Sequence, residues 1–415
     1  MRRKLYYWAK EKIISDNIRV YLLAIPLIIV LVNSIMNNGF NLEDFLDTDI
    51  LISFILVALC DSIAKWAQGY IQKKCEDSAK LTDDYSSLVK KYSCESLIEY
   101  GKNNKFPVIC LCSRTKEQKW DIQVCDSNEE FYELPSQAAN FSQELMNAHK
   151  QSVLYNQINI RLSSVNYDAE KRNVTLHTSR TYYFDSMITN RACDYLLSNG
   201  KTIREIFEPG PYIRDLNSSK MSNHLGFNGF IMTNDGKIPF IMRSADLSIG
   251  KNTLADSIGA SMKTKYAVGK DSGMRVTKQS IGYAMIREIE DELSLGELDV
   301  SNEEAADSIF AFYRDLVEGG KPQFLFFLKL NISSEELRKN FTEASHQKSI
   351  TKQDKVIRDG KRMLLFDVEQ LKNATITAGN MTVSSGESAG SYQMMPSASA
   401  SVVMLLQFLE SSCIY

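Results

Sequence analysis

One stretch of this sequence, residues 273–295, places a glycine turn ahead of a helix whose acidic residues collect on one side. At about 100° per residue, Glu288, Asp291 and Glu292 fall on one helical face. The opposite, inward-packing face consists of small or apolar residues, namely Gly282, Ile286, Ile289 and Leu293. Three carboxylates this close raise one another's proton affinity unless a positive group lies among them, and a hard divalent cation is the usual one. The pattern therefore predicts a Mg²⁺ or Mn²⁺ site. The alternative is a solvated amphipathic surface helix, because Glu and Asp near Arg are common on exposed faces.

The spacing resembles the Nudix box, in which Gly, five residues, Glu and seven residues precede Arg-Glu-hydrophobic-x-Glu-Glu-x-Gly-hydrophobic. The residues that match in register, without an insertion, are Gly273, Arg287, Glu288, Ile289, Glu292 and Leu295. Three positions differ from the family: Gln279 replaces the first Glu, Asp291 the penultimate Glu, and Ser294 the closing Gly.

The Nudix resemblance implies roles for individual residues. It implies that Glu288, Asp291 and Glu292 hold the metal, with Glu288 and Glu292 as the catalytic acids. Nucleotide contacts are expected from Gly273, Gln279, Arg287 and Arg243. Arg287 normally pairs with the first glutamate of the box, but with Gln279 it can make only a charge-assisted hydrogen bond. The shorter Asp291 reaches a metal through water, so these departures favour nucleotide binding over hydrolysis.

The segments around the box also fit this resemblance. Residues 228–232 and 238–242 are apolar strand candidates joined by a Thr-Asn-Asp-Gly turn, which predicts a hairpin, and Arg243 follows at once. Residues 308–313 and 323–330 predict a second strand pair, and Ser333 caps a helix after it. The expected fold class is α/β, with a Nudix-type α/β/α sandwich over residues 222–415. Residues 382–401, rich in Ser, Ala and Gly, are expected to form a loop or lid.

Two apolar stretches lie near the amino terminus. Residues 18–36 are apolar apart from Arg19, Asn33 and Ser34, a length close to the minimum for spanning a bilayer core. A weaker stretch at residues 50–70 contains Asp61 and Lys65 one helical turn apart. The sequence thus predicts a membrane anchor, residues 1–75, with two transmembrane helices. A cleavable signal peptide is the alternative, but no small-residue cleavage pattern follows the first stretch.

The charges that flank these stretches predict their orientation. Six Lys or Arg residues precede the end of the first apolar run and three follow the second, whereas residues 37–49 between them carry four acids and no Lys or Arg. The positive-inside rule then places both termini in the cytoplasm. The predicted location is the bacterial inner membrane, with a multi-pass anchor.

Composition limits the remaining possibilities. The chain has 415 residues, a net charge of −3 and 44% hydrophobic residues, enough for two soluble cores beyond the anchor. Residues 76–221 predict a mixed α+β middle lobe, which no long linker separates from the region after it. The eight cysteines show no Cys-x-x-Cys pair, so neither zinc nor a disulfide framework is indicated. No basic cluster is strong enough to predict binding of DNA or RNA.

The whole-chain plan, two membrane helices before a Nudix domain, is similar to the two-transmembrane Nudix effectors of bacterial cyclic-oligonucleotide antiphage defence (CBASS). The resemblance implies that the cytoplasmic region senses a cyclic nucleotide and that the membrane helices disrupt the inner membrane, causing abortive infection. Two helices cannot enclose a path alone, so the expected partners are the nucleotide, membrane lipid and further copies of the chain. The alternative function is a membrane-tethered, Mg²⁺-dependent pyrophosphohydrolase of a nucleoside diphosphate derivative.

Overall fold

The chain divides into two compact units, Met1–Glu76 and Asp77–Tyr415. The computed structural model describes residues 79, 81–102, 104–149, 156–243, 250, 252–268, 274–347 and 360–410. Both predicted transmembrane spans, 18–36 and 50–70, therefore lie outside the described residues. Among the helices described, none joins the length and the apolar composition that crossing a bilayer requires.

The described part contains helices and four separate sheets, so the predicted mixed α/β class is confirmed. The largest sheet has six strands in the order β1 (Leu97–Glu99), β2 (Lys105–Ser113), β10 (Ile309–Asp315), β11 (Lys321–Lys329), β6 (Gly226–Met232) and β9 (Ile258–Ser261). β11 and β6 run parallel, and the other neighbours are antiparallel. The predicted pairing of residues 308–313 with 323–330 is confirmed as the β10–β11 hairpin. Residues on both sides of the predicted division at 221 share this sheet, because β2 pairs with β10.

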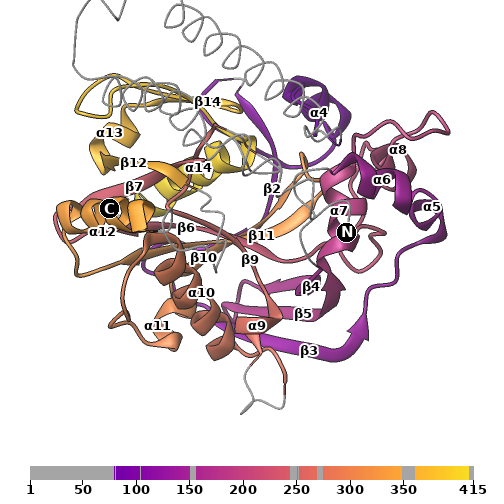
Figure 1. The fold of residues 1–415 in the computed structure, drawn as a ribbon, viewed down its shortest axis with the longest axis horizontal. Helices are drawn as coiled ribbons and strands as arrows, with labels where there is room; N and C mark the ends of the chain where they lie inside the picture. The colour runs from indigo at the N-terminus through magenta and orange to yellow at the C-terminus, as the bar shows by residue number, and fades with distance from the viewer. Residues whose placement is uncertain are drawn as a thin grey trace, which may run out of the picture. The chain divides into compact units, whose positions relative to one another are not determined.

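The two faces of this sheet carry different cores. Alternation along the strands puts Phe227 and Phe324, whose rings stack at 5.1 Å, in the same core as helix α10 (Lys278–Leu293). Phe230 and Phe310 lie in the other core, where the Phe310 ring stacks at 4.4 Å on Phe408 of helix α14 (Pro396–Glu410). The sheet thus lies between α10 and α14 (Figure 1). The predicted inward face of α10 is confirmed, since Gly282, Ile286, Ile289 and Leu293 are all buried.

Three smaller sheets and several short helices complete the unit. The sheets have the orders β12 (Gly360–Asp367), β7 (Lys237–Arg243), β8 (Leu254–Ala255); β13 (Thr375–Thr377), β14 (Asn380–Val383), β15 (Gly390–Gln393); and β3 (Asp121–Phe131), β5 (Asn173–Tyr182), β4 (Ile158–Asp168). The shorter helices are α4 (Tyr85–Lys91), α5 (Ser136–Ala139), α6 (Ser142–Ala148), α7 (Tyr183–Ile188), η2 (Asn190–Ala192), α8 (Ile203–Phe207), α9 (Thr264–Ala267), α11 (Asn302–Asp307), α12 (Ser334–Gln347) and α13 (Val368–Lys372).

The hairpin predicted for residues 228–232 and 238–242 is wrong in its pairing. Both strands form, as β6 and β7, and the turn between them closes where the Gly236 N–H donates to the Thr233 carbonyl at 3.0 Å. However, β6 already has β11 and β9 as its two neighbours, so β7 pairs with β12 and β8 in a separate sheet. The turn signal located the strands correctly but could not identify their partners.

The loop predicted for residues 382–401 is also wrong over most of its length. It contains the end of β14, all of β15, and the first turns of α14, which begins at Pro396. Proline is well suited to the first position of a helix, and the serines that follow can bond within it. The Ser401 hydroxyl donates to the Ser397 carbonyl at 2.8 Å, so this residue, fully buried, keeps its polar group satisfied.

A glycine-to-alanine change tests the close packing of α10 against α11. A Cβ at Gly282 would overlap the backbone carbonyl of Asn302. We expect Gly282→Ala to lower the free energy of unfolding by about 1–3 kcal/mol in denaturant titrations of the full chain. Helix propensity alone predicts the opposite sign, a gain of up to about 1 kcal/mol.

The matched control is Gly296→Ala, because no atom lies within 4 Å of the position a Cβ would take there. This variant should leave the stability within about 0.5 kcal/mol of wild type, or raise it slightly. A Gly282→Ala protein as stable as the Gly296→Ala protein would contradict the packing described.

Candidate functional site

Helix α10 has a defined start and end. The Thr277 hydroxyl accepts from the Ser280 N–H at 3.1 Å, and the Ser280 hydroxyl accepts from the Thr277 N–H at 2.8 Å, which is a reciprocal cap. The helix ends at Ser294, whose φ of 58° lies in the left-handed region that favours glycine. Ser294 stands where the Nudix pattern has a glycine, and it adopts this left-handed conformation without glycine's freedom.

The three acidic residues of the box, which we call the acid face, lie against the turn that carries α9. Glu288 is almost fully buried, and its Oε1 lies 2.5 Å from Nζ of Lys263. The exposed Asp291 accepts a hydrogen bond from the Tyr266 hydroxyl at 3.1 Å. Glu292 is half-buried and acts electrostatically on Lys263. The structure therefore brings the three predicted ligands to one region, next to an ammonium and a phenol.

The charge on Lys263 is stabilised by the acid face. Burial disfavours the ammonium, but the attraction and hydrogen bond of Glu288, followed by the attraction of Glu292, outweigh burial, so the pKa of Lys263 is raised. The side chain is 29% exposed, whereas that of Glu288 is 5% exposed. At neutral pH the acid face thus has a permanent positive partner.

The acid face does not form a metal-ligand set in this arrangement. Within the ranges given above, no group of three or more His, Cys, Asp or Glu side chains is placed to hold a metal ion. The Glu288 carboxylate faces an ammonium and Asp291 faces a hydroxyl, whereas Mg²⁺ needs several oxygens converging at about 2.1 Å. The donor set therefore does not fit the predicted Mg²⁺ or Mn²⁺ site as the side chains stand.

The other predicted residues do not gather at the acid face. Arg287 is partly exposed and pairs with Glu290, whose other oxygen accepts from the Leu298 N–H at 3.0 Å and so holds the segment after the helix. Gln279 is exposed in the first turn of α10, about ten residues before the acids. Arg243 ends β7, where its guanidinium lies beside Gly250 and Gly259. Gly273 lies outside the described residues.

Another pair of residues, which sequence reasoning missed, secures the segment before α10. Asp126 on β3 and Arg180 on β5 form a two-point ion pair with both distances at 2.7 Å, and their side chains are 1% and 4% exposed. Asp126 also accepts from the Val276 N–H at 2.9 Å, and Arg180 donates to the Met274 carbonyl at 3.2 Å. Burial raises the pKa of Asp126, but the hydrogen bonds from Arg180, Thr178 and the Val276 N–H, together with the charge of Arg180, outweigh burial, so the pKa is lowered. The middle segment therefore positions the box helix.

A polar group also lies on the α14 side of the sheet, near Arg243. The Asn228 amide donates to the Tyr313 hydroxyl at 2.5 Å and to Gln323 Oε1 at 2.8 Å. The neighbouring Asp256 is buried, which raises the pKa of its carboxyl well above the usual value. Amide, hydroxyl and carboxyl groups of this kind can read the hydrogen-bonding edge of a base, but here the Asn228, Tyr313 and Gln323 side chains bond to one another.

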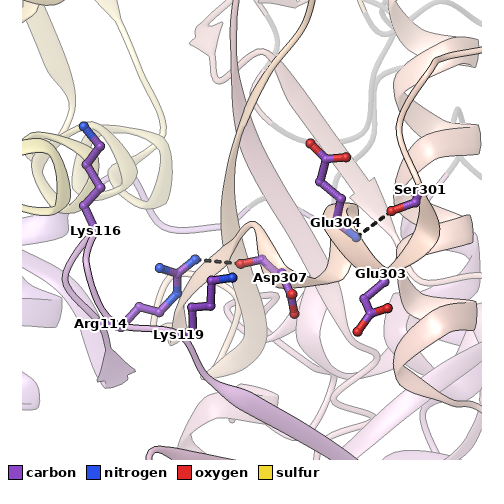
Figure 2. Close-up of a pocket in the computed structure, with 7 residues that line it drawn as sticks. All are labelled: Arg114, Lys116, Lys119, Ser301, Glu303, Glu304 and Asp307. Atoms are coloured by element: carbon purple, nitrogen blue, oxygen red, sulfur yellow. Dashed lines mark hydrogen bonds between the residues drawn. The ribbon is translucent and has the colours of Figure 1, made fainter.

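An open cleft of about 430 Å³ lies between the segment that follows β2 and helix α11, and we call it the mixed-charge cleft. Its lining residues are Arg114, Lys116, Lys119, Ser301, Glu303, Glu304 and Asp307. Figure 2 shows Arg114 and Lys119 pointing toward Asp307, with Glu303 and Glu304 extending from the opposite wall. Arg114 donates to the Asp307 carbonyl at 2.6 Å and to the Ile309 carbonyl at 2.9 Å, so it links the two walls. Because both signs of charge line the cleft, it does not offer phosphate a uniformly positive surface.

Comparison of the sequence with models of known protein families gives no match, and comparison with curated proteins gives none either. The resemblance to Nudix proteins therefore rests on the box residues and on the elements around them.

The Asp126–Arg180 pair can be tested by removing its negative charge. Asp126→Asn leaves the Arg180 guanidinium buried without a carboxylate, and we expect the free energy of unfolding to fall by about 3 kcal/mol. Amide hydrogen exchange in residues 274–277 should also become faster. Asp168→Asn, which removes an exposed pair with Lys171, is the control and should leave the unfolding midpoint unchanged.

The stability difference between wild type and Asp126→Asn should depend on pH, because folding lowers the pKa of Asp126. The pKa of Asp126 is lower in the folded chain, so its stabilisation is present above the unfolded-state pKa of about 4 and is lost as the pH falls through the folded-state value. The stability difference between wild type and Asp126→Asn should therefore shrink below about pH 4. A difference that stays constant down to pH 3 would contradict this assignment.

Proposed function

We propose that this protein is the membrane-anchored effector of a bacterial CBASS antiphage system, in which the cytoplasmic Nudix-like region binds a cyclic nucleotide and the amino-terminal helices disrupt the inner membrane. The soluble part is a Nudix-type α/β/α sandwich, with α10 as the box helix. The arrangement of α10 and α14 on opposite faces of a mixed sheet supports this assignment. The predicted anchor, residues 1–75, supplies the membrane half of the proposal.

One observation favours a receptor over a hydrolase. The carboxylates of Glu288 and Asp291 are each engaged by a side chain of the α9 turn, Lys263 and Tyr266. Metal-assisted hydrolysis needs such carboxylates to converge on a cation that polarises phosphate and lowers the pKa of its bound water. A face on which Glu288 and Asp291 already have side-chain partners supports ligand binding without turnover. Gln279 and Ser294, which replace the first Glu and the closing Gly of the box, also favour binding without turnover.

Ligand binding is tested on the full chain in detergent with a panel of cyclic di- and trinucleotides. A ligand that binds only the folded state stabilises it, by about 2.7 kcal/mol at 100 times its dissociation constant. We expect one member of the panel to raise the thermal midpoint, and the linear nucleotide of the same bases to raise it much less. A panel without any shift would contradict the receptor proposal.

Turnover is measured with the same nucleotides and with nucleoside diphosphate derivatives, in the presence of Mg²⁺ or Mn²⁺. The receptor proposal predicts no release of phosphorylated products. Metal-dependent release that is lost in Glu292→Gln would instead establish the tethered pyrophosphohydrolase.

The membrane half of the proposal is tested in bacterial cells that make the bound nucleotide. Expression of the full chain should collapse the membrane potential, as reported by a potential-sensitive dye. Deletion of residues 1–70 should abolish the effect, because the predicted spans are removed. An unchanged potential in cells where the nucleotide is bound to the full chain would refute the effector role.

A further inference from the structure

The positive group at the acid face belongs to the chain itself. Nζ of Lys263 lies 2.5 Å from Glu288, and Glu292 also acts on it. Its partner Glu288 is 5% exposed, so solvent cannot replace the ammonium as the source of compensation for the buried negative charge. Lys263 therefore places one positive charge among the three clustered acids, where it pairs with Glu288 and attracts Glu292.

The position of Lys263 is fixed by the backbone on both sides of it. The Ala267 N–H donates to the Lys263 carbonyl at 2.9 Å, which closes the turn of α9, and the Thr264 hydroxyl donates to the Ile158 carbonyl of β4 at 2.9 Å. The preceding residue, Met262, bonds to Leu225 and Ile160 at 2.9 Å each. The Lys263 side chain thus extends toward Glu288 from a turn that hydrogen bonds hold on both sides.

Tyr266 adds a second contact from the same turn. Its hydroxyl donates to Asp291 at 3.1 Å, and its ring lies 5.9 Å from Nζ of Lys263. The ring face attracts cations, so it favours the charged form of Lys263 at this position. A divalent ion entering between Glu288 and Glu292 would meet this ammonium at close range and be repelled by it.

We propose that the ammonium of Lys263 takes the place of a divalent metal ion at the acid face, so that the Nudix-like site of this protein works without Mg²⁺ or Mn²⁺. This proposal rests on the proposed function, because it concerns the charges at the same site. It does not need a nucleotide for its test, so the two proposals can fail separately.

The experiment measures Mn²⁺ binding to the full chain in detergent, by the electron paramagnetic resonance signal of free Mn²⁺. Wild type should show no specific site. In Lys263→Met the aliphatic stem remains but the ammonium is gone, and the acids left without it should bind Mn²⁺ at least about tenfold more tightly than in wild type. Lys263→Gln is a second variant, in which the side chain keeps a polar end without a charge, and its Mn²⁺ affinity should rise in the same way. Adding Glu288→Gln to either variant should abolish the gain.

Lys265→Met is the matched control, since it removes a positive charge from the same turn. Its ammonium is exposed, bonds the Tyr266 hydroxyl at 3.1 Å and acts on Asp291 through screening solvent, so Mn²⁺ affinity should change less than about twofold on its removal. Two results would overturn the proposal. One is a specific Mn²⁺ site in wild type that Glu288→Gln removes. The other is the absence of any gain in the two Lys263 variants when circular dichroism shows both to be folded.

Discussion

A buried carboxylate requires a positive or hydrogen-bonding partner, and at Glu288 this requirement determines how the acid face is built. The partner is Lys263, which comes from a turn that is anchored by backbone and hydroxyl hydrogen bonds to β4 and to Leu225, the residue before β6. The same contact fixes the distance between that turn and the C-terminal half of α10. If the ammonium were lost, Glu288 would have to take up a proton, find a metal or move into solvent.

Contacts on two sides of α10 hold its acid face next to Lys263. On the inner side, Ile281, Ile289 and Leu293 pack on the aromatic face of the sheet, and Gly282 lets α11 approach closely. On the outer side, the Asp126–Arg180 pair holds the segment just before the helix. The middle segment of the chain is therefore part of the site's support, and two of its strands, β1 and β2, also belong to the sheet that contains β6, β10 and β11.

The elements of this fold that sequence could predict are those with a local signal. The periodicity of α10, the strands around the Gly236 turn and the β10–β11 hairpin were all visible in short windows. The pairing of β7 was not, because strand partners depend on which edges are already occupied. The start of α14 was missed because buried serines that bond back to their own helix have the composition of a loop. Lys263 precedes Glu288 by 25 residues and Asp126 precedes Val276 by 150, so neither contact leaves a spacing pattern.

Crystallography can show whether an ammonium or a metal ion is the positive group at the acid face. Crystals of the protein grown in millimolar MnCl₂ and measured at the manganese absorption edge would reveal any bound ion by its anomalous signal. We expect no anomalous peak among Glu288, Asp291 and Glu292, with Nζ of Lys263 in hydrogen-bonding contact with Glu288. A peak coordinated by these carboxylates, with Lys263 turned away, would contradict it.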